Sequence, residues 1–277
     1  MTDILTAALI VGGIGLLCSV ILTLAAKFMS VEKNETEEKL REALPGANCG
    51  ACGYTGCDGY ACALADGSEK RTNLCIPGAD AVSKQISNIL GVEFVDVVER
   101  VAFVHCTGDC NTARYKYDYN GSIHSCAAAN LLWNGSKACE HGCLGYGDCV
   151  KACPNDAICI ENGIAHVDSR KCTGCGLCAK ACPNHIIDLM PDVDKVVLTC
   201  VNREKGAITR KKCDNACIAC KKCEKACEHD AIHVIDNLAQ IDYSKCIHCE
   251  TCASVCPVGC IKISDFRGIH RYETKEN

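Results

Sequence analysis

Cysteine density constrains this chain more than any other feature of its sequence. There are 29 cysteines among 277 residues, several times ordinary usage. A short secreted chain this rich in cysteine would be a disulfide scaffold, but this chain is longer, its cysteine count is odd, and most cysteines stand in tight C-x-x-C runs that typically ligate a shared metal. With only four Phe and one Trp, a thin hydrophobic core is expected, and bound metal is expected to help hold the fold together.

Residues 1–29 are predicted to anchor the chain in a membrane. Residues 4–26 contain no charged side chain, and a helix of that length spans roughly 34 Å, enough to cross a hydrocarbon core. A cleaved signal peptide is the alternative, but it needs a basic start and a shorter apolar core, whereas this chain starts with an acidic residue at Asp3. Lys27 and Lys33 follow the span and favour a cytoplasmic location for what comes after it.

A glycine-rich loop predicts an iron–sulfur cluster in a small domain, with its linker, over residues 30–100. The cysteines follow the pattern C-x2-C-x4-C-x17-C, so three thiolates share one loop and the fourth comes from a distance. This arrangement suits a [4Fe-4S] cubane, because each of its irons needs one sulfur. A four-cysteine zinc site is the alternative. The predicted ligands are Cys49, Cys52, Cys57 and Cys75.

An internal repeat predicts two tandem ferredoxin-like modules in the rest of the chain. Residues 143–182 superimpose on residues 217–256 at a shift of 74, and each copy contains two runs related to C-x2-C-x2-C-x3-C. This is the pattern of two-cluster ferredoxins, and short strands are expected to begin at Ala157-Ile158 and Ala231-Ile232, after the fourth cysteines. The expected fold class is α+β: one N-terminal transmembrane helix, a small 4Fe-4S domain, and two two-cluster ferredoxin-like modules. The modules are expected at residues 101–199 and 200–277.

The ferredoxin pattern also predicts how the cysteines pair into ligand sets. The fourth cysteine of each run ligates the other cluster, which links the two halves of a module. Three complete sets follow: Cys153 with Cys172, Cys175 and Cys178; Cys256 with Cys217, Cys220 and Cys223; and Cys227 with Cys246, Cys249 and Cys252.

The fourth ligand set departs from the pattern. Tyr146 stands where the middle cysteine of the run is expected. Cys139, just upstream, is the predicted replacement. The resulting set is Cys139, Cys143, Cys149 and Cys182.

The remaining cysteines suggest a sixth cluster. The repeat extends upstream, since Cys126 and Cys139 superimpose on Cys200 and Cys213 at the same shift of 74. Buried free thiols or a diverged ligand set are the alternative, and Cys110 is an alternative ligand. The hypothesised ligands are Cys106, Cys126, Cys200 and Cys213. Five cysteines are interpreted as bystanders: Cys18, Cys62, Cys110, Cys159 and Cys260.

No residues for bond-making catalysis stand out. The sequence has no G-x-G-x-x-G that opens a helix after a strand and no Walker loop, so the chain is expected to bind neither NAD nor a nucleoside triphosphate. The formal charge of -5 argues against nucleic-acid partners. A row of cubanes tethered to a membrane would relay electrons, and the chemistry would be completed on partner subunits.

The whole arrangement resembles the B subunit of the Rnf ion-translocating electron-transport complex, in its long, polyferredoxin form. The resemblance covers the N-terminal span, the loop PGANCGACGYTGC at residues 45–57, Cys75 with the Ile-Pro-Gly that follows it, and GCLGYGDC at residues 142–149. It implies a translocase that oxidises ferredoxin, reduces NAD and moves Na⁺ or H⁺.

The resemblance also implies the part that such a chain has in the complex. It would accept electrons from soluble ferredoxin and relay them, while the flavins and the NAD site would belong to other subunits. The implied location is the cell membrane, with a single pass, contact with membrane lipid and the iron–sulfur domains in the cytoplasm.

Two other classes of function remain open from the sequence. One is a polyferredoxin relay subunit of another membrane oxidoreductase, such as a hydrogenase, and the subunits that co-purify would distinguish it. The other is a redox sensor or metal-storage protein, which would fail to exchange electrons with reduced ferredoxin at a useful rate.

Removal of iron is expected to unfold the part of the chain beyond residue 45. The clusters are expected to take the place of a large hydrophobic core, so their binding free energy is also folding free energy. Circular dichroism of chelator-treated protein under anaerobic conditions, during a thermal ramp, measures this. A retained cooperative unfolding transition in the iron-free protein would contradict the expectation.

Overall fold

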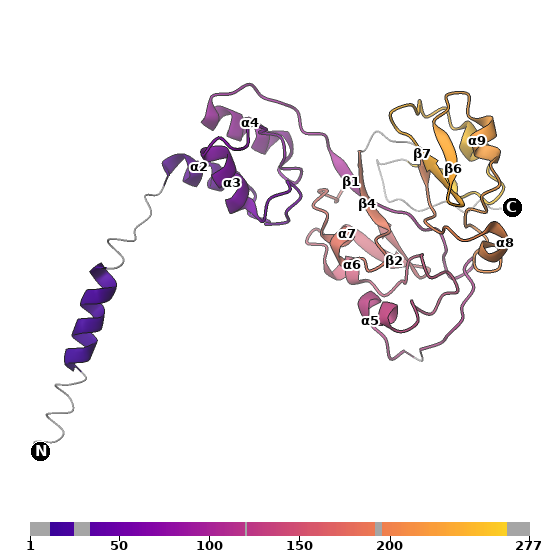
Figure 1. Cartoon of the computed structure of the whole chain (residues 1–277), viewed down its shortest axis with the longest axis horizontal. Helices are drawn as coiled ribbons and strands as arrows, with labels where there is room; N and C mark the ends of the chain where they lie inside the picture. The colour runs from indigo at the N-terminus through magenta and orange to yellow at the C-terminus, as the bar shows by residue number, and fades with distance from the viewer. Residues whose placement is uncertain (1–11, 25–33, 120, 192–195, 265–277) are drawn as a thin grey trace, which may run out of the picture.

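The computed structural model describes residues 12–24, 34–119, 121–191 and 196–264, and it places a helix, a small helical domain and a larger body one after another (Figure 1). Residues 12–24 form the helix, and its large apolar side chains are exposed, with Leu16 at 69 %. Within the described ranges, no helix is long and apolar enough to cross a membrane. Both ends of the predicted anchor lie outside the described residues.

Three helices form the small domain: α2 (Glu35–Ala43), α3 (Cys57–Ala65) and α4 (Ala79–Leu90). The side chain of Asn34 caps α2 by accepting a hydrogen bond from the N–H of Thr36. The left-handed conformation of Gly91 ends α4. The buried residues of this core are Leu40, Leu44, Cys57, Tyr60, Ala61, Leu64, Cys75 and Ile86.

The 74-residue repeat is present in the structure as two equivalent hairpins in the larger body. β2 (Ile158–Glu161) pairs antiparallel with β3 (Ile164–Val167), and β6 (Ile232–Ile235) pairs in the same way with β7 (Leu238–Ile241). Every strand of the second hairpin is displaced by 74 residues from its counterpart in the first. The first strand of each begins where the sequence predicts it.

Short helices carry the cysteine runs and repeat in the same way. Each of these helices begins directly after a residue in the left-handed conformation. Gly147 precedes the first helix, and Lys221 precedes the helix that corresponds to it in the second module. The pairs related by the repeat are α6 (Asp148–Lys151) with α9 (Lys222–Ala226), and α7 (Leu177–Ala181) with α10 (Thr251–Ser254).

Each module is completed by two strands that are far apart in sequence. β1 (Arg100–Val104) pairs with β4 (Ile187–Pro191), and β5 (Val196–Leu198) pairs with β8 (Ile261–Ile263), all antiparallel. By its pairing, β5 belongs to the second module, although it precedes residue 200.

The register of these pairs reveals an insertion in the first module. Val104 lies opposite Ile187, and Leu198 lies opposite Ile261. Ile187 and Ile261 are 74 residues apart, whereas Val104 and Leu198 are 94 residues apart. The first module therefore has 20 additional residues between β1 and the first cysteine run.

The inserted segment includes α5 (Cys126–Leu131), whereas α8 (Gly206–Thr209) lies in the shorter connection of the second module. Ser125 caps α5 by accepting from the N–H of Ala128. The Asp148 carboxylate, in α6, accepts hydrogen bonds from the Ser125 hydroxyl and the Ala127 N–H, both at 2.9 Å. The start of α5 is therefore held against the helix that carries Cys149.

A small apolar contact joins the two modules. Phe103 of β1, Met190 of β4 and Val197 of β5 are all buried and pack together. The larger cores of both modules mix short aliphatic side chains with buried cysteines. The arrangement of cysteine side chains is therefore part of the core itself.

Candidate iron–sulfur sites

Twenty-four cysteines gather into six groups of four, which we call sites A to F. Four groups have the composition predicted from the sequence. Site A is Cys49, Cys52, Cys57 and Cys75; site B is Cys153, Cys172, Cys175 and Cys178; site E is Cys217, Cys220, Cys223 and Cys256; and site F is Cys227, Cys246, Cys249 and Cys252.

The other two groups differ from the sequence-based assignment by one exchange. The structure places Cys126, and not Cys139, in the group that completes the first module. Cys139 lies instead in the group that the two modules share. Site C is therefore Cys126, Cys143, Cys149 and Cys182, and site D is Cys106, Cys139, Cys200 and Cys213.

The insertion in the first module explains this exchange. A constant shift of 74 places Cys126 opposite Cys200, but the strand register makes Cys106 the counterpart of Cys200. The backbone N–H of Cys143 donates to the Sγ of Cys106 at 3.3 Å, and the N–H of Cys217 donates to the Sγ of Cys200 at the same distance. The same N–H to sulfur hydrogen bond is therefore present in both modules, with Cys106 in one and Cys200 in the other.

A sequence signal for this correspondence exists. An apolar strand ends two residues before Cys106, and another apolar strand ends two residues before Cys200. The signal is weak because the two segments are short and lie outside the cysteine runs. Aligning these strands, and not the upstream cysteines, reveals the 20-residue insertion.

Cys126 compensates for the cysteine that the first module lacks. Tyr146 occupies the position equivalent to Cys220 of site E. The hydrogen bonds of Asp148 to the start of α5 hold Cys126 beside this gap, and Tyr146 packs against Cys126 and Leu144. The inserted segment therefore supplies the fourth thiol of site C.

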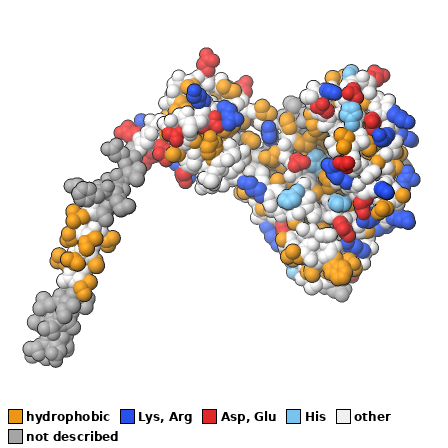
Figure 2. All heavy atoms as spheres, viewed as in Figure 1, with side chains coloured by type: hydrophobic (Ala, Val, Ile, Leu, Met, Phe, Trp, Pro, Cys, Tyr) orange, Lys and Arg blue, Asp and Glu red, His pale blue; other side chains and the backbone are white. Residues whose placement is uncertain are grey.

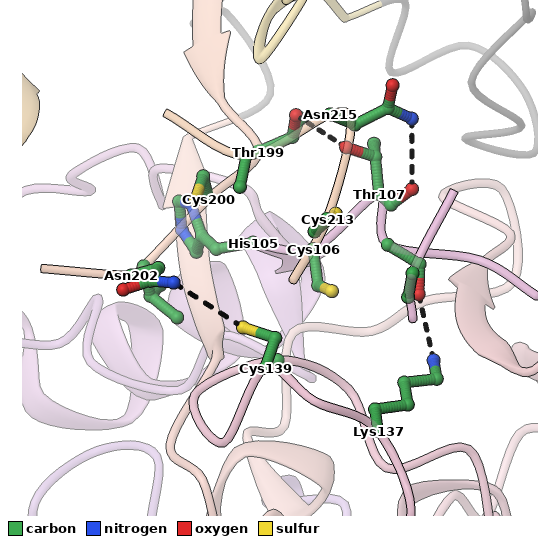
Figure 3. Close-up of a pocket in the computed structure, with 15 residues that line it drawn as sticks. His105, Cys106, Thr107, Lys137, Cys139, Thr199, Cys200, Asn202, Cys213 and Asn215 are labelled. Atoms are coloured by element: carbon green, nitrogen blue, oxygen red, sulfur yellow. Dashed lines mark hydrogen bonds between the residues drawn. The ribbon is translucent and has the colours of Figure 1, made fainter. Parts of the chain in front are cut away.

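Site D lies between the modules and receives two cysteines from each (Figure 3). The space between these thiols, including the part that is open to solvent, is about 370 Å³. A Cβ atom added to Gly142 would come within 3.2 Å of the Cys106 Sγ, and one added to Gly108 within 3.3 Å of the Cys213 Sγ. Glycine at both positions keeps this space free.

A buried lysine lines the cavity of site D. Lys137 is 3 % exposed, and its ammonium donates 2.8 Å hydrogen bonds to the carbonyl oxygens of Gly108 and Gly163. Among the described residues, no carboxylate lies within ion-pair distance of it. A buried ammonium needs a compensating negative charge, so the cavity beside Lys137 favours an anionic occupant.

Burial keeps several of the grouped thiols protonated in the absence of metal. It raises the pKa of Cys200 and of Cys149 to about 12, and the pKa of Cys213 to about 11. Metal ligands must be thiolates. Iron is the positive charge that would displace these protons.

Site E contains an additional thiol that is absent from its counterparts. Cys260 is 2 % exposed, and its Sγ lies 3.6 Å from that of Cys256. Its hydrogen bonding lowers the pKa of Cys256 to about 5 and that of Cys217 to about 6. The equivalent positions of the other three runs hold Ala157, Ile186 and Ala231.

Three of the other predicted bystanders, Cys18, Cys62 and Cys110, are exposed, and Cys159 is half-buried. None of the four lines the cavities at sites A and C to F. In the part of the chain that the structure describes, no three His, Cys, Asp or Glu side chains converge tightly enough to hold one metal ion. In sites A and C to F, the thiols instead line cavities.

Short links connect neighbouring sites from A to D, and Lys180, two residues after Cys178 of site B, makes the first of them. Between sites A and B, the Lys180 ammonium donates to the Cys49 carbonyl at 2.7 Å. Between sites B and C, Cys178 lies close enough to Cys149 to contribute to its raised pKa. Between sites C and D, the contact is the bond from the Cys143 N–H to the Cys106 sulfur.

The succession continues through the second module. The bond from the Cys217 N–H to the Cys200 sulfur joins sites D and E. Cys223 of site E lies in α9, and Cys227 of site F directly follows the end of that helix. The six sites therefore form one unbroken series, A–B–C–D–E–F.

This fold and these four-cysteine groups define a multi-cluster iron–sulfur protein of the ferredoxin type. Three family models match the chain. An Fe–S cluster family covers residues 44–77, a 4Fe-4S binding domain covers residues 165–188 and 239–262, and a further 4Fe-4S binding domain covers residues 214–230. The two matches of the second model are separated by the same 74 residues as the structural repeat.

Curated relatives extend the similarity to nearly the whole chain. The B subunit of the proton-translocating ferredoxin:NAD(+) oxidoreductase complex of Clostridium ljungdahlii is 43% identical over 265 residues, which is 95% of this chain and 93% of the relative. The B subunit of the Na(+)-translocating complex of Acetobacterium woodii is 44% identical over 94% of this chain and 78% of its own. The B subunit of an ion-translocating oxidoreductase complex of Methanosarcina acetivorans is 36% identical over 92% and 96%. The chain therefore belongs to the B-subunit family of Rnf ion-translocating ferredoxin:NAD oxidoreductase complexes.

The exchange of Cys126 and Cys139 between sites is tested by paired substitutions. Cys126→Ala combined with Cys143→Ala removes two ligands of site C, so we expect the iron content to fall from roughly 24 to roughly 20 per chain. Cys139→Ala combined with Cys143→Ala affects two different sites, and iron should fall to roughly 16. Iron and acid-labile sulfide analysis of anaerobically purified protein measures both.

The assignment from constant repeat spacing makes the opposite prediction for these two double variants. Obtaining roughly 16 irons for the first and 20 for the second would therefore overturn the structural grouping. Cys110→Ala serves as the control, since Cys110 is exposed and lines none of the cavities. It should retain the iron content of the parent protein.

Proposed function

We propose that this chain is the membrane-anchored electron-transfer subunit of an Rnf-type complex. It accepts electrons from reduced ferredoxin and relays them within a complex that couples ferredoxin oxidation and NAD reduction to Na⁺ or H⁺ translocation. The observation that carries the proposal is the unbroken series of six four-cysteine sites, together with family membership. A bound [4Fe-4S] cluster takes up and releases one electron at a time.

Each of sites A to F is proposed to hold one [4Fe-4S] cluster, six in total. The donor sets fit, because each site offers four thiols and a cubane presents four irons. Backbone N–H groups donate to sulfurs in several sites, including Ala157 to Cys153 and Ala231 to Cys227, both at 3.4 Å. Such bonds favour the anionic form of the sulfur.

Site D is the link on which the relay depends. It receives ligands from both modules, so without it sites A to C would be separated from sites E and F. Lys137 supports an anionic occupant here, since an oxidised cubane with four thiolates carries roughly -2. The buried ammonium and the cluster would each supply the charge that the other lacks.

The remaining parts of the proposal concern location and partners. Residues 4–26 are proposed to anchor the chain as a single pass, with the iron–sulfur domains in the cytoplasm. Other membrane and peripheral subunits of the complex, membrane lipid and soluble ferredoxin are the proposed partners. NAD and flavin are assigned to other subunits, and nucleic acid is not a proposed partner.

Lys137 should raise the reduction potential of site D. Lys137→Gln removes the positive charge but keeps a hydrogen-bond donor, so adding an electron there becomes less favourable by roughly 1–2 kcal/mol. That corresponds to a potential lower by about 40–85 mV for one electron. An anaerobic redox titration followed by electron paramagnetic resonance measures it.

Lys211 provides the matched control for this measurement. It is the counterpart of Lys137 at the 74-residue shift, but it is exposed. Lys211→Gln should leave every potential unchanged within error. If Lys137→Gln also left every potential unchanged, the proposed occupant of site D would lose its main support.

Deletion of this subunit tests the function directly. Membranes that contain the complete complex should form NADH from reduced ferredoxin and NAD. Membranes that lack this chain should lose nearly all of that rate, because the electrons have no other path in the proposed relay. Re-expression of the chain should restore activity. Unchanged NADH formation after the deletion would overturn the proposal.

A further inference from the structure

Sites E and F each expose one cysteine at the surface of the second module. Cys220 of site E and Cys249 of site F are both exposed. Electron transfer to a protein partner needs a cluster close to the surface on which the partner docks. The charges around the two exposed cysteines therefore indicate which site a charged electron donor approaches.

Basic side chains surround site E. Lys221 lines its cavity beside Cys220, and Lys222 and Lys225 lie on α9 and are exposed. Figure 2 shows Lys and Arg side chains gathered along the right-hand edge of the larger body, over α8 and α9. We call Lys221, Lys222 and Lys225 the lysine patch.

Few acidic groups neutralise the lysine patch. Lys221 lies 3.7 Å from the Glu224 carboxylate. Among the described residues, Lys222 and Lys225 have no carboxylate within ion-pair distance. Their charges are therefore available to a partner.

The repeat shows that this charge is specific to the second module. Residues 209–226 carry six Lys or Arg and two Asp or Glu, whereas the equivalent residues 135–152 carry two of each kind. The counterparts of Lys221 and Lys222 are Gly147 and Asp148. The cluster-binding frame is the same in both copies, so the frame does not require the lysines.

Site F presents the opposite charge. Glu250 lines its cavity beside Cys249, and the exposed Glu228 directly follows Cys227 in the chain. An anionic partner is therefore attracted to site E and repelled from site F.

We propose that the lysine patch is the docking surface for soluble reduced ferredoxin, and that ferredoxin delivers its electron to site E. This rests on the proposed function. Ferredoxin fits because each of its cubanes carries roughly -2 from the cluster and its thiolates. One electron leaves the ferredoxin cluster and one arrives at site E, with no bond made or broken.

Neutralising the lysine patch tests this docking surface. The triple variant Lys221→Gln, Lys222→Gln and Lys225→Gln is made in the complete complex, and reduction by the organism's own ferredoxin is followed by anaerobic stopped-flow absorbance. Electrostatic steering raises association rates at low salt, so the second-order rate constant should fall about tenfold at low ionic strength. Its dependence on salt should also become weaker than in the parent complex.

Two further variants separate docking from general charge and from damage to site E. Lys39→Gln, Lys70→Gln and Lys171→Gln together remove the same charge from exposed positions elsewhere and should leave the rate unchanged. The double variant Lys222→Gln and Lys225→Gln alters no residue that lines the site E cavity, so it should keep full iron content and still slow reduction several-fold.

The outcomes distinguish this inference from the proposed function. If ferredoxin reduces the parent complex, and both lysine variants match its rate constant and salt dependence, the docking surface is wrong and the function stands. If the control triple variant slows reduction as much as the lysine patch variant, the effect is general charge and the docking surface is also wrong. If ferredoxin fails to reduce the parent complex at all, the proposed function itself fails.

Discussion

Four cysteine thiols converge at each site, and the rest of this structure depends on bringing about that convergence six times. The chain has few large apolar side chains, and its cores are built from short aliphatic residues packed around buried cysteines. Helices such as α6 and α9 are only a turn or so long, too short to be stable alone. Their positions are fixed by the thiols they carry and by the strand pairs that close each module.

The two modules form one continuous body because their contacts converge around site D. The N–H of Arg114 donates to the Lys212 carbonyl, the N–H of Asp214 donates to the Thr112 carbonyl, and the Arg114 guanidinium pairs with the Asp214 carboxylate at 2.9 Å. The exposed ion pair contributes little by itself. Together with the apolar contact around Phe103, these bonds set the separation across which site D receives two thiols from each side.

The sequence predicts whatever is encoded by local spacing, and it fails where the fold brings distant segments together. The groups at sites A, B, E and F follow from the sequence because three of their cysteines lie within one short run. Sites C and D each require thiols from separate segments. Their grouping depends on the long-range strand register and on a 20-residue insertion, and neither follows from the periodicity of the runs. The exchange of Cys126 and Cys139 is the direct result.

The duplication also shows how one pattern of thiols can be placed in different surroundings. The thiol sets of sites C and E are nearly equivalent, but their surroundings differ. Site E has Cys260 as an additional hydrogen-bonding thiol, site D has the buried ammonium of Lys137, and site F has Glu250 at its cavity. Hydrogen bonds to sulfur and nearby positive charge stabilise the reduced cluster, and nearby carboxylates destabilise it. In the proposed relay, the buried ammonium of Lys137 therefore favours an electron at site D, and the carboxylate of Glu250 disfavours one at site F.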